Sequence, residues 1–445
     1  MSDGTLRFIH LSDIHFSNRV ARFGFDPDRE LRSRIVDDVR GMREKLGDAT
    51  AILVSGDIAY AGQRAEYDDA ARWLNEICDA AGCARSEVRL CPGNHDIDQS
   101  VIRLNPLIQD GHNAVRREER YYDRCNALDQ RLNQTEARAM FYSPLAGYNE
   151  FAARYESSFF ADETSFVWER DFALNDGSTL RVRGLNTALL SGPGDREGSM
   201  FLGSRATTLH RQAGVEYLTM SHHPPNWLLD KRETEQALDG DARIQLFGHE
   251  HESRVMPGRD WVKLFAGAVN PHRSEPNWHP GYNVIEVRVQ DGAERKLHVD
   301  VYAREWQGSP PQFRFIEDRG NVEFHHVELA LDKLPEGWRS PWIEEEEASP
   351  PASGVSQGTS ADIESSHGTE MPMVTKQQRF RDIVYRFFSR NLSEKNEIVG
   401  TLKLVVEEDS RLVDVERFKL QLKRARERDQ LDALDEMIKK LEAGA

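Results

Sequence analysis

The chain lacks the long apolar runs of membrane proteins and the dense cysteines of small secreted proteins. No apolar stretch approaches the roughly 18 residues that a membrane-spanning helix needs, so we expect no membrane segment and no membrane partner. Residues 1–5 show no basic segment followed by an apolar one, which predicts no secretory signal and a cytoplasmic location. The cysteines fit neither a zinc-knuckle spacing nor a disulfide framework, and we predict structural free thiols at Cys78, Cys83, Cys91 and Cys125.

Basic residues are also in deficit. The chain has 58 Lys and Arg against 75 Asp and Glu, a formal net charge of −17. Such a charge argues against broad electrostatic adhesion to nucleic acid, because that mode of binding needs clustered cations. Nucleic acid at a metal site remains compatible with it, since bound divalent cations invert the local potential. The length of 445 residues predicts at least two domains.

What the chain does contain is a series of polar stretches, each directly after an apolar run typical of a strand. In residues 90–96 the run ends at Pro-Gly and is followed by Asn94, His95 and Asp96. The other stretches hold Asp13 and His15, Asp57, His222 and His223, and His249 and His251. In open α/β sheets such positions lie at the carboxyl ends of strands, where ligands bind.

Periodicity predicts an α/β fold. Strand patterns alternate with helical ones in a βαβαβ order, with strands at 6–11, 51–54 and 88–90 and helices at 28–46 and 67–81. Strand patterns return at 166–168, 180–185, 216–220 and 244–247. Alternating apolar residues then predict a second, largely antiparallel sheet from 262–265, 282–287 and 297–302.

Three further segments differ in composition. Residues 99–165 carry no strand pattern and predict a helical insertion, either a layer that only packs or a cap that shapes substrate binding. Residues 336–375, acidic and rich in Ser and Pro, predict a disordered linker after a catalytic domain of residues 1–335. Apolar stripes at helical spacing in residues 376–445 predict a small all-α bundle of about four helices.

Imidazole, carboxylate and amide groups are the donors that hold borderline divalent metals, and two such ions can clamp a phosphate. A lone Asp-x-His is weak support for a metal site, whereas five such stretches in this order, each after a strand, are strong support. Together they resemble the signature of the calcineurin-like metallophosphoesterases, over about residues 5–330: Asp13-x-His15, Gly56-Asp57, Gly93-Asn94-His95-Asp96, His222 and Gly248-His249-x-His251.

The resemblance implies a four-layer αββα sandwich with a helical insertion and two divalent metal ions. Manganese is favoured for them, with iron, zinc or nickel as alternatives. By position-by-position match, one ion would be held by Asp13, His15 and His251. The other would be held by Asn94, His222 and His249. Asp57 would bridge the two ions.

The same match assigns two catalytic residues. His95 would contact the phosphate and the leaving group rather than a metal, and Asp96 would orient His95 by a hydrogen bond. His222 is preferred as the ligand because it directly follows the strand, and His223 is the alternative.

These patterns predict a dinuclear metal-dependent phosphodiesterase of the class III phosphodiesterase and nuclease-like branch, acting on DNA, RNA or a nucleotide. The alternatives are a phosphomonoesterase and a nucleotide-sensing scaffold without turnover. The C-terminal helices resemble effector-associated modules of bacterial conflict systems, which implies an antiviral defence effector with a protein partner bound through residues 376–445. A dimerisation or stability module is the other interpretation of these helices.

Overall fold

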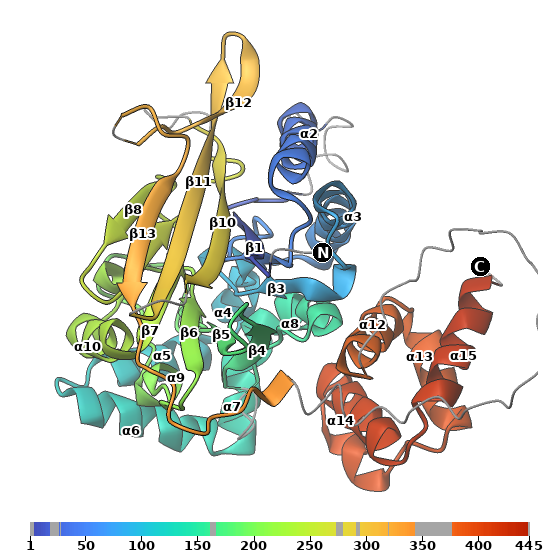
Figure 1. Cartoon of the computed structure of the whole chain (residues 1–445). Helices are drawn as coiled ribbons and strands as arrows, with labels where there is room; N and C mark the ends of the chain where they lie inside the picture. Colours follow the sequence, from blue (N-terminus) through green and yellow to red (C-terminus); the bar gives the residue numbers. More distant parts are fainter. Residues whose placement is uncertain are drawn as a thin grey trace, which may run out of the picture.

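The structure is a computed structural model that describes residues 4–17, 26, 28–160, 166–272, 279–290, 294–318, 320–342 and 376–443. Two β-sheets pack face to face in an N-terminal domain that extends to residue 342, and a helical bundle stands beside it (Figure 1). The main hydrophobic core lies between the sheets and under the flanking helices. Among the described helices, none has both the length and the hydropathy to cross a membrane.

The first sheet confirms the predicted βαβαβ unit. Strands β1 (Leu6–Leu11), β2 (Ala51–Val54) and β3 (Val88–Leu90) run parallel and are linked by helices α2 (Arg29–Leu46) and α3 (Arg64–Ala81). Antiparallel strands extend the sheet beyond β1: β10 (Gly281–Gln290), β11 (Lys296–Gly308), β12 (Pro311–Phe315) and β13 (His325–Ala330). Because β1, β2 and β3 are parallel, their carboxyl ends meet at one edge.

The second sheet differs from the prediction. It contains β4 (Trp168–Ala173), β5 (Thr179–Gly184), β6 (Val215–Met220), β7 (Ala242–Phe247), β9 (Val262–Phe265) and β8 (Arg254–Pro257). Residues 282–287 and 297–302 were wrongly assigned to it, because β10 pairs with β1 and completes the first sheet. The strand at 262–265 runs parallel to β7. An alternating strand pattern does not show which neighbour a strand will pair with.

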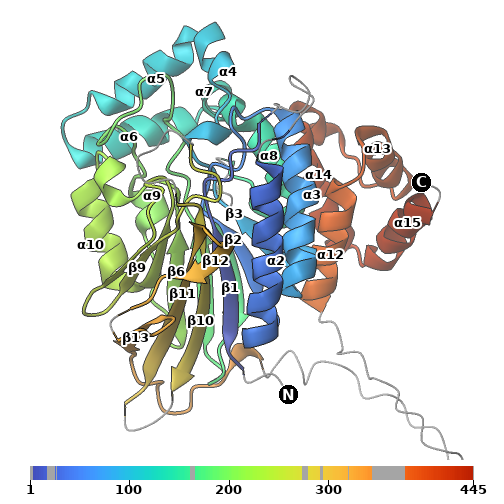
Figure 2. The ribbon, with the colours of Figure 1, turned by 90° about the horizontal axis from the view of Figure 1, so that it is seen from above.

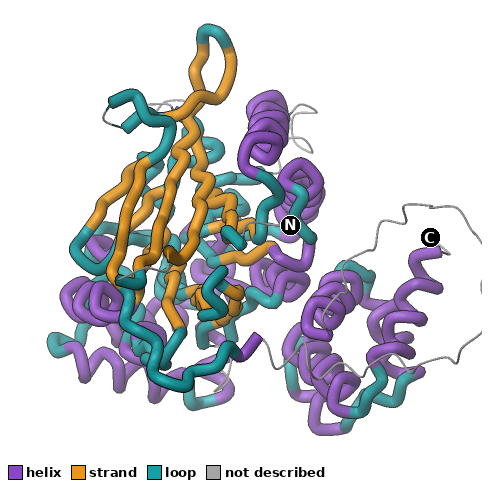
Figure 3. Tube along the Cα trace, viewed as in Figure 1, coloured by secondary structure: helices purple, strands orange, loops and turns teal. Residues whose placement is uncertain are grey.

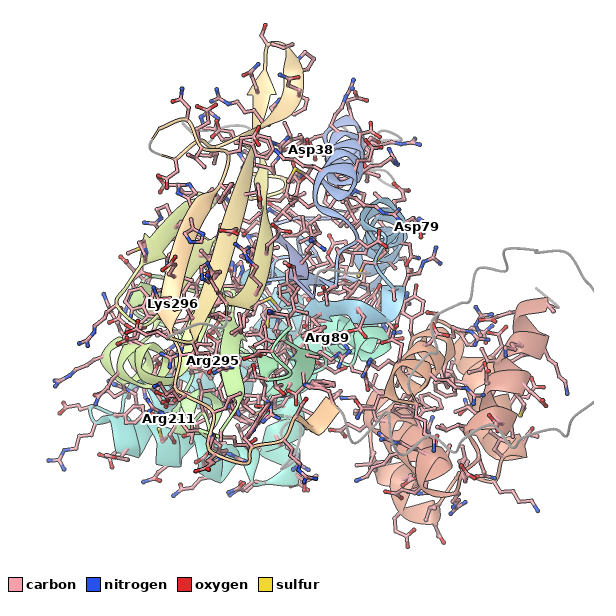
Figure 4. The ribbon with its side chains drawn as sticks, in the orientation of Figure 1. Asp38, Asp79, Arg89, Arg211, Arg295 and Lys296 are labelled. Carbon is pink, nitrogen blue, oxygen red and sulfur yellow. The ribbon has the colours of Figure 1, made fainter. Side chains whose placement is uncertain are left out.

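Helices cover the outer faces of both sheets, as expected for a layered α/β sandwich. Helices α2 and α3 lie side by side against the first sheet, and α9 (Ser204–Thr207) and α10 (Lys231–Asp241) lie against the second (Figure 2). Asp38 fastens α2 to the sheet, accepting hydrogen bonds from Arg304 Nη2 at 2.6 Å and from the Tyr282 hydroxyl at 2.6 Å (Figure 4). The α/β fold class is confirmed.

The described part of the insertion is built from helices and contains no strand, as predicted. It consists of α4 (Gln99–Leu104), α5 (Pro106–Arg116), α6 (Tyr121–Leu132), α7 (Thr135–Tyr142) and α8 (Ala146–Ala152), with 3₁₀ turns after α7 and α8 (Figure 3). Residues 161–165 of the expected insertion lie outside the described residues.

The N-terminal domain ends later than predicted. Residues 336–342 were assigned to a disordered linker, but the Trp338 indole donates to the Ala213 carbonyl at 3.3 Å and the Trp342 indole to Thr179 Oγ1 at 3.2 Å. Two tryptophans therefore bind this segment to the second sheet. Residues 343–375 lie outside the described residues, so the disorder of that part stays a prediction.

The predicted bundle of four helices is present: α12 (Lys376–Phe388), α13 (Leu392–Thr401), α14 (Asp414–Glu427) and α15 (Leu431–Ala443). It has a hydrophobic core of its own, centred on the rings of Phe387 and Phe418, whose centroids are 5.5 Å apart. Among the described residues, Ala153 of the N-terminal domain joins this core, and Tyr385 of α12 packs against the core of the N-terminal domain. A buried ion pair between Arg381 and Glu87, with N and O at 3.0 Å, attaches α12 to the N-terminal domain.

A chain ending after Trp342 should fold, because the bundle shares so little core with the rest of the protein. We expect the truncated protein to stay soluble, to unfold in one cooperative transition and to bind metal like the full chain. Circular dichroism melting and metal analysis would measure this. A matched chain ending after Pro335, which loses both tryptophans, should melt at a lower temperature. Loss of cooperative unfolding in the longer truncation would contradict an independent bundle.

Candidate metal centre

The polar stretches that follow β1, β2, β3, β6 and β7 meet at one edge of the paired sheets. Of the five groups of three described residues whose ligand atoms lie within 4.8 Å of one another, four lie at this edge. They are Asp13, His15 and His251; Asp13, Asp57 and His222; His15, Asp57 and His95; and His222, His223 and His249. Asn94 joins them, because its Oδ1 lies 3.2 Å from His222 Nε2. All seven predicted metal ligands thus come together, although their assignment as ligands stays a prediction.

Asp57 lies at the centre of this cluster. Its Oδ2 is 3.3 Å from His15 Nε2 on one side and 3.2 Å from His222 Nε2 on the other. Its Oδ1 accepts the backbone N–H of His95 at 2.8 Å. A carboxylate in this position can reach two ions at once, as the predicted bridging role requires.

The remaining ligands form the two sides of the cluster. On one side, His251 Nε2 lies 3.2 Å from Asp13 Oδ1. On the other side, His249 Nδ1 lies 3.1 Å from His222 Nε2. The backbone N–H of His249 also donates to Asp13 Oδ2 at 3.0 Å, which connects the two sides.

The hydrogen bonds of the histidines show that the cluster fits cations. The Nδ1–H of His222 donates to the Ser55 carbonyl at 2.9 Å, and the Nδ1–H of His15 donates to the Asn270 carbonyl at 3.3 Å. In the neutral rings each Nε2 therefore turns a lone pair toward Asp57. Facing lone pairs at about 3 Å repel unless a proton or a metal ion lies between them. Imidazole, carboxylate and amide donors of this kind suit borderline divalent metals.

The backbone at these ligands is unusual. Asp13, His15, Asp57, His249 and His251 all have positive φ, between 51° and 69°. This left-handed conformation is uncommon for residues other than glycine and costs on the order of 1 kcal/mol or more at each position. Strain concentrated at one place is typical of a functional site, because the surrounding fold must hold it there.

Two glycines make room for the ligands. A Cβ on Gly93 would lie 2.0 Å from Asp57 Oδ1, and a Cβ on Gly56 would lie 2.6 Å from the His222 ring. Gly56 also has a φ of 107°. The Gly-Asp and Gly-Asn pairs of the motifs are thus explained by close approach of one ligand loop to the next.

Burial and charge set the pKa values within the cluster. Burial acts to raise the pKa of Asp57, but His222, His15 and His95 more than offset it, and the pKa lies well below its ordinary value. Burial acts to lower the pKa of His222, yet the Asp57 and Asp13 carboxylates raise it to about 9. His249 has a pKa lowered to about 4, by burial first and then by the charge on His222.

The predicted hydrogen bond from Asp96 to His95 is wrong. The buried Asp96 carboxylate instead accepts the backbone N–H groups of Gly93, Ile58 and Ala59 and the Tyr67 hydroxyl, at 2.9 to 3.2 Å. His95 Nδ1–H donates to the Tyr60 carbonyl at 2.8 Å. Asp96 therefore fastens the loop after β2 to the loop after β3, and a carbonyl rather than a carboxylate orients His95.

His222 and His223 lie in different surroundings. His222 faces Asp57 and Asn94, whereas the His223 ring is held by Thr187 Oγ1, 3.0 Å from its Nδ1. His223 Nε2 is buried without a hydrogen-bond partner among the described residues, and His223 itself belongs to the group of His222 and His249. The preference for His222 agrees with this arrangement.

Sequence reasoning missed three residues of the site. The Trp227 ring packs edge-on against the His249 ring at 4.0 Å, Tyr67 reaches Asp96 from helix α3, and the Asn270 carbonyl orients His15. Trp227 follows the His-His-Pro-Pro stretch closely enough to have been suspected. No local sequence pattern indicates that Tyr67 or Asn270 belongs to the site.

Comparison with known proteins places this arrangement in a family. Residues 6–253, more than half of the chain, match the family described as calcineurin-like phosphoesterase. The chain belongs to the calcineurin-like phosphoesterases. Residues 379–440 match the GTPase-associated adaptor domain, an adaptor domain of conflict systems. The protein is therefore a metal-dependent phosphoric ester hydrolase by family, with an adaptor domain at its C-terminal end.

Individual relatives are distant. The phosphoesterase is 25% identical over 351 residues to the uncharacterized metallophosphoesterase-like protein YydB of Bacillus subtilis, covering 74% of this chain and 67% of the relative. Among solved structures, a conserved uncharacterized protein of Streptococcus pneumoniae TIGR4 is 11% identical, covering 74% of this chain and 98% of that one, with a TM-score of 0.28. Vacuolar protein sorting 29 of Cryptosporidium parvum is 10% identical, covering 74% and 99%, with a TM-score of 0.31.

Asp57→Asn should lower the metal content of the phosphoesterase without unfolding it. The change removes the one carboxylate that faces both sides of the cluster, so at least one of two bound metal equivalents should be lost, together with most of the activity. Elemental analysis of purified protein, with a melting curve as the folding check, would measure this. His210→Ala, at an exposed position outside the cluster, is the matched control and should keep its metal. Full metal content in Asp57→Asn would contradict the bridging role.

Metal binding should release protons. In the metal-free phosphoesterase the pKa of His222, about 9, keeps the ring protonated at pH 7, and a metal ion must displace that proton. Against the effect of burial, Asp57 also raises the pKa of His15, so we expect at least one proton released per protein at pH 7 and an affinity that rises as the pH approaches 9. Calorimetric titration in two buffers with different ionisation enthalpies counts the protons. Metal affinity independent of pH between 7 and 9 would show that His222 is not a ligand.

Proposed function

We propose that the phosphoesterase is a phosphodiesterase that cleaves nucleic acid or a nucleotide with two divalent metal ions. The observation that carries the proposal is the make-up of the cluster: among the described residues, the charges that act most strongly on Asp13 and Asp57 are those of histidines and of the two carboxylates themselves, and none is an arginine. Arg254, close to His251, pairs with Glu250. A phosphomonoester carries one more negative charge than a diester, and sites that bind it usually add cationic donors such as arginine. The surroundings of this cluster suit the less charged diester.

Asp13, His15, Asp57, Asn94, His222, His249 and His251 would hold the metal ions, with manganese favoured and iron, zinc or nickel as alternatives. When bound, these ions would offset the charge of the phosphoryl group and ease ionisation of an attacking water. The protein supplies the fixed geometry. Its strained ligand backbones and the carbonyls behind His15 and His222 position the donors before the ions bind.

His95 is placed to act on the leaving group. Its ring lies 4.8 Å from the His15 ring and beside the half-exposed Tyr60, at the open rim of the cluster. Because Nδ1–H is donated to the Tyr60 carbonyl, the protonated ring would offer Nε2–H to the departing oxygen. The same position puts His95 near His15 and Asp57, so variants must distinguish an acid from a ligand.

The insertion supports nucleic-acid binding only in part. Arg116 is engaged structurally, since it donates to the carbonyls of Leu190 and Ser199. Arg117, Arg120 and Tyr122 are exposed and available to a phosphate backbone and bases. The insertion therefore combines packing residues with an exposed polar edge.

The C-terminal adaptor domain supports a role as an effector in bacterial defence, bound to a partner protein. Its described helices and turns expose several large apolar side chains that a partner could cover: Leu392, Val405, Val413 and Leu420. A domain held on a linker would bring the phosphoesterase to the place where its partner assembles.

His95→Ala should keep its metal and lose most of its turnover. General-acid assistance typically contributes about 10²–10⁴-fold, and a loss in that range is expected with little change in metal content. Turnover of a generic diester and elemental analysis would be measured on the same preparation. Tyr60→Phe is the matched control, because it keeps the carbonyl that holds His95 and the ring beside it and loses only the hydroxyl, so it should remain close to wild type. Loss of metal in His95→Ala would make His95 a ligand.

The phosphoesterase should prefer diesters. We expect hydrolysis of bis(p-nitrophenyl) phosphate and of at least one nucleic-acid or cyclic-nucleotide substrate in manganese, at rates at least about tenfold above p-nitrophenyl phosphate. Single- and double-stranded DNA and RNA would be assayed alongside. Faster monoester cleavage without diester cleavage would indicate a phosphomonoesterase. No turnover in the metal-loaded protein would indicate a nucleotide-sensing scaffold.

A further inference from the structure

A pocket of about 640 Å³ lies between the N-terminal domain and the bundle. Its walls come from β3, β4, β5 and the segment around Ala153 on one side, and from α12 and α14 on the other. None of the described residues of the metal cluster lines it. Its size is typical of sites for small molecules, and both domains must be in place to form it.

The lining is strongly cationic for a chain with a net charge of −17. Three acidic residues line it, against seven basic ones: Arg89, Arg170, Arg181, Arg381, Lys419, Lys423 and Arg426. Asp171 neutralises one of these basic residues, Arg181, which donates two hydrogen bonds of 2.7 Å to its carboxylate. The other cations lie at the inner end of the pocket and along its bundle side.

At the inner end, Glu87 serves three guanidinium groups, and the Glu156 carboxylate lies 4.0 Å from Arg89 Nη2. Glu87 accepts Arg170 Nη2 at 2.9 Å and Arg381 Nε at 3.0 Å, and lies 3.5 Å from Arg89 Nη2. Burial lowers the pKa of both Arg89 and Arg381, and the nearby Arg170 adds to the lowering. Glu87 and Glu156 together supply two negative charges to three guanidinium groups, which leaves an excess of positive charge here.

Arg89 shows where a further acceptor belongs. Its side chain is 2% exposed, and Nη1 donates to the carbonyls of Ser86, Val88 and Tyr155. Its Nη2 is buried with no hydrogen-bond partner among the described residues. Figure 4 places Arg89 on the flank of the N-terminal domain that faces the bundle. Buried guanidinium donors are normally satisfied, so an anionic acceptor would complete this group.

On the bundle side, α14 presents a row of cations. Lys419, Lys423 and Arg426 are spaced at i, i+4 and i+7, which places them on one face over roughly 10 Å of helix. That length matches a chain of several phosphates. Phe380 also lines the pocket, with the Arg426 guanidinium 5.2 Å from its ring centroid, and offers a flat apolar surface.

We propose that this pocket binds a nucleoside polyphosphate. The phosphates lie between the Arg89 and Arg381 guanidinium groups and the cationic face of α14, and the base packs against Phe380. Because both domains supply ligands, the bound nucleotide fastens the bundle to the N-terminal domain. The pocket and the metal centre are also close in sequence. Arg89 of the pocket lies on β3, and Asn94 of the metal cluster follows this strand.

Calorimetric titration of the full-length protein with ATP and with GTP tests the proposal, with adenosine and guanosine as phosphate-free probes. We expect at least one triphosphate to bind and neither nucleoside to bind. By linkage, the bound triphosphate should also raise the melting temperature of the full chain. Failure of both triphosphates to bind at millimolar concentration would overturn the proposal.

Variants locate the site. Lys423→Glu/Arg426→Glu reverses two exposed charges of the pocket and should weaken triphosphate binding by about tenfold or more. Lys440→Glu, a charge reversal on α15 of the same bundle, is the matched control and should bind like wild type. Wild-type protein stripped of metal and titrated in EDTA should still bind the triphosphate, because the pocket lies outside the metal centre. Binding lost on metal removal, or unchanged in the double variant, would overturn the proposal. So would binding of a single-stranded oligonucleotide without any mononucleotide.

Discussion

The placement of one carboxylate, that of Asp57, is the constraint on which the rest of the phosphoesterase depends. It must face His15 from its own sheet and His222 from the other sheet, while accepting the backbone N–H of His95. This requires two sheets packed face to face with their strand ends at the same edge, and loops that approach so closely that Gly56 and Gly93 have no room for a side chain. Most of the predicted ligands adopt left-handed backbone conformations in these loops. Burial of the large hydrophobic core offsets the free-energy cost of these conformations.

The adaptor domain and the metal centre are connected through a very short element. Glu87, where Arg381 of the bundle binds, directly precedes strand β3, and Asn94 of the metal cluster follows the end of the strand. The Trp168 indole, which lines the pocket between the domains, donates to the Leu90 carbonyl of the same strand at 2.8 Å. The position of the bundle and the position of the Asn94 loop are thus determined by neighbouring contacts on one rigid strand.

Local sequence patterns correctly predicted the features of the fold that depend on neighbouring residues. The strand ends that carry Asp13, Asp57 and Asn94 were found because an apolar run stops at a polar, glycine-containing turn, and the helical periodicity of residues 376–443 was enough to predict the bundle. Predictions failed where the cause was a contact distant in the chain. Residues 282–287 joined the first sheet through pairing with β1, and Asp96 bonded backbone groups of the loop after β2 rather than the neighbouring His95.

The sequence by itself determined the chemistry available to this protein: which donor residues follow which strands, that the fold is α/β, and that an acidic segment separates a helical bundle from it. Only the tertiary structure decided how those donors meet, because the distances between Asp57, His15 and His222 depend on the packing of two sheets. The same holds for the cationic pocket, since Arg89 and α14 lie far apart in the chain and their charges come together only when the bundle docks. Charge and residue type are properties of single positions, whereas a site is a property of how the chain brings those positions together.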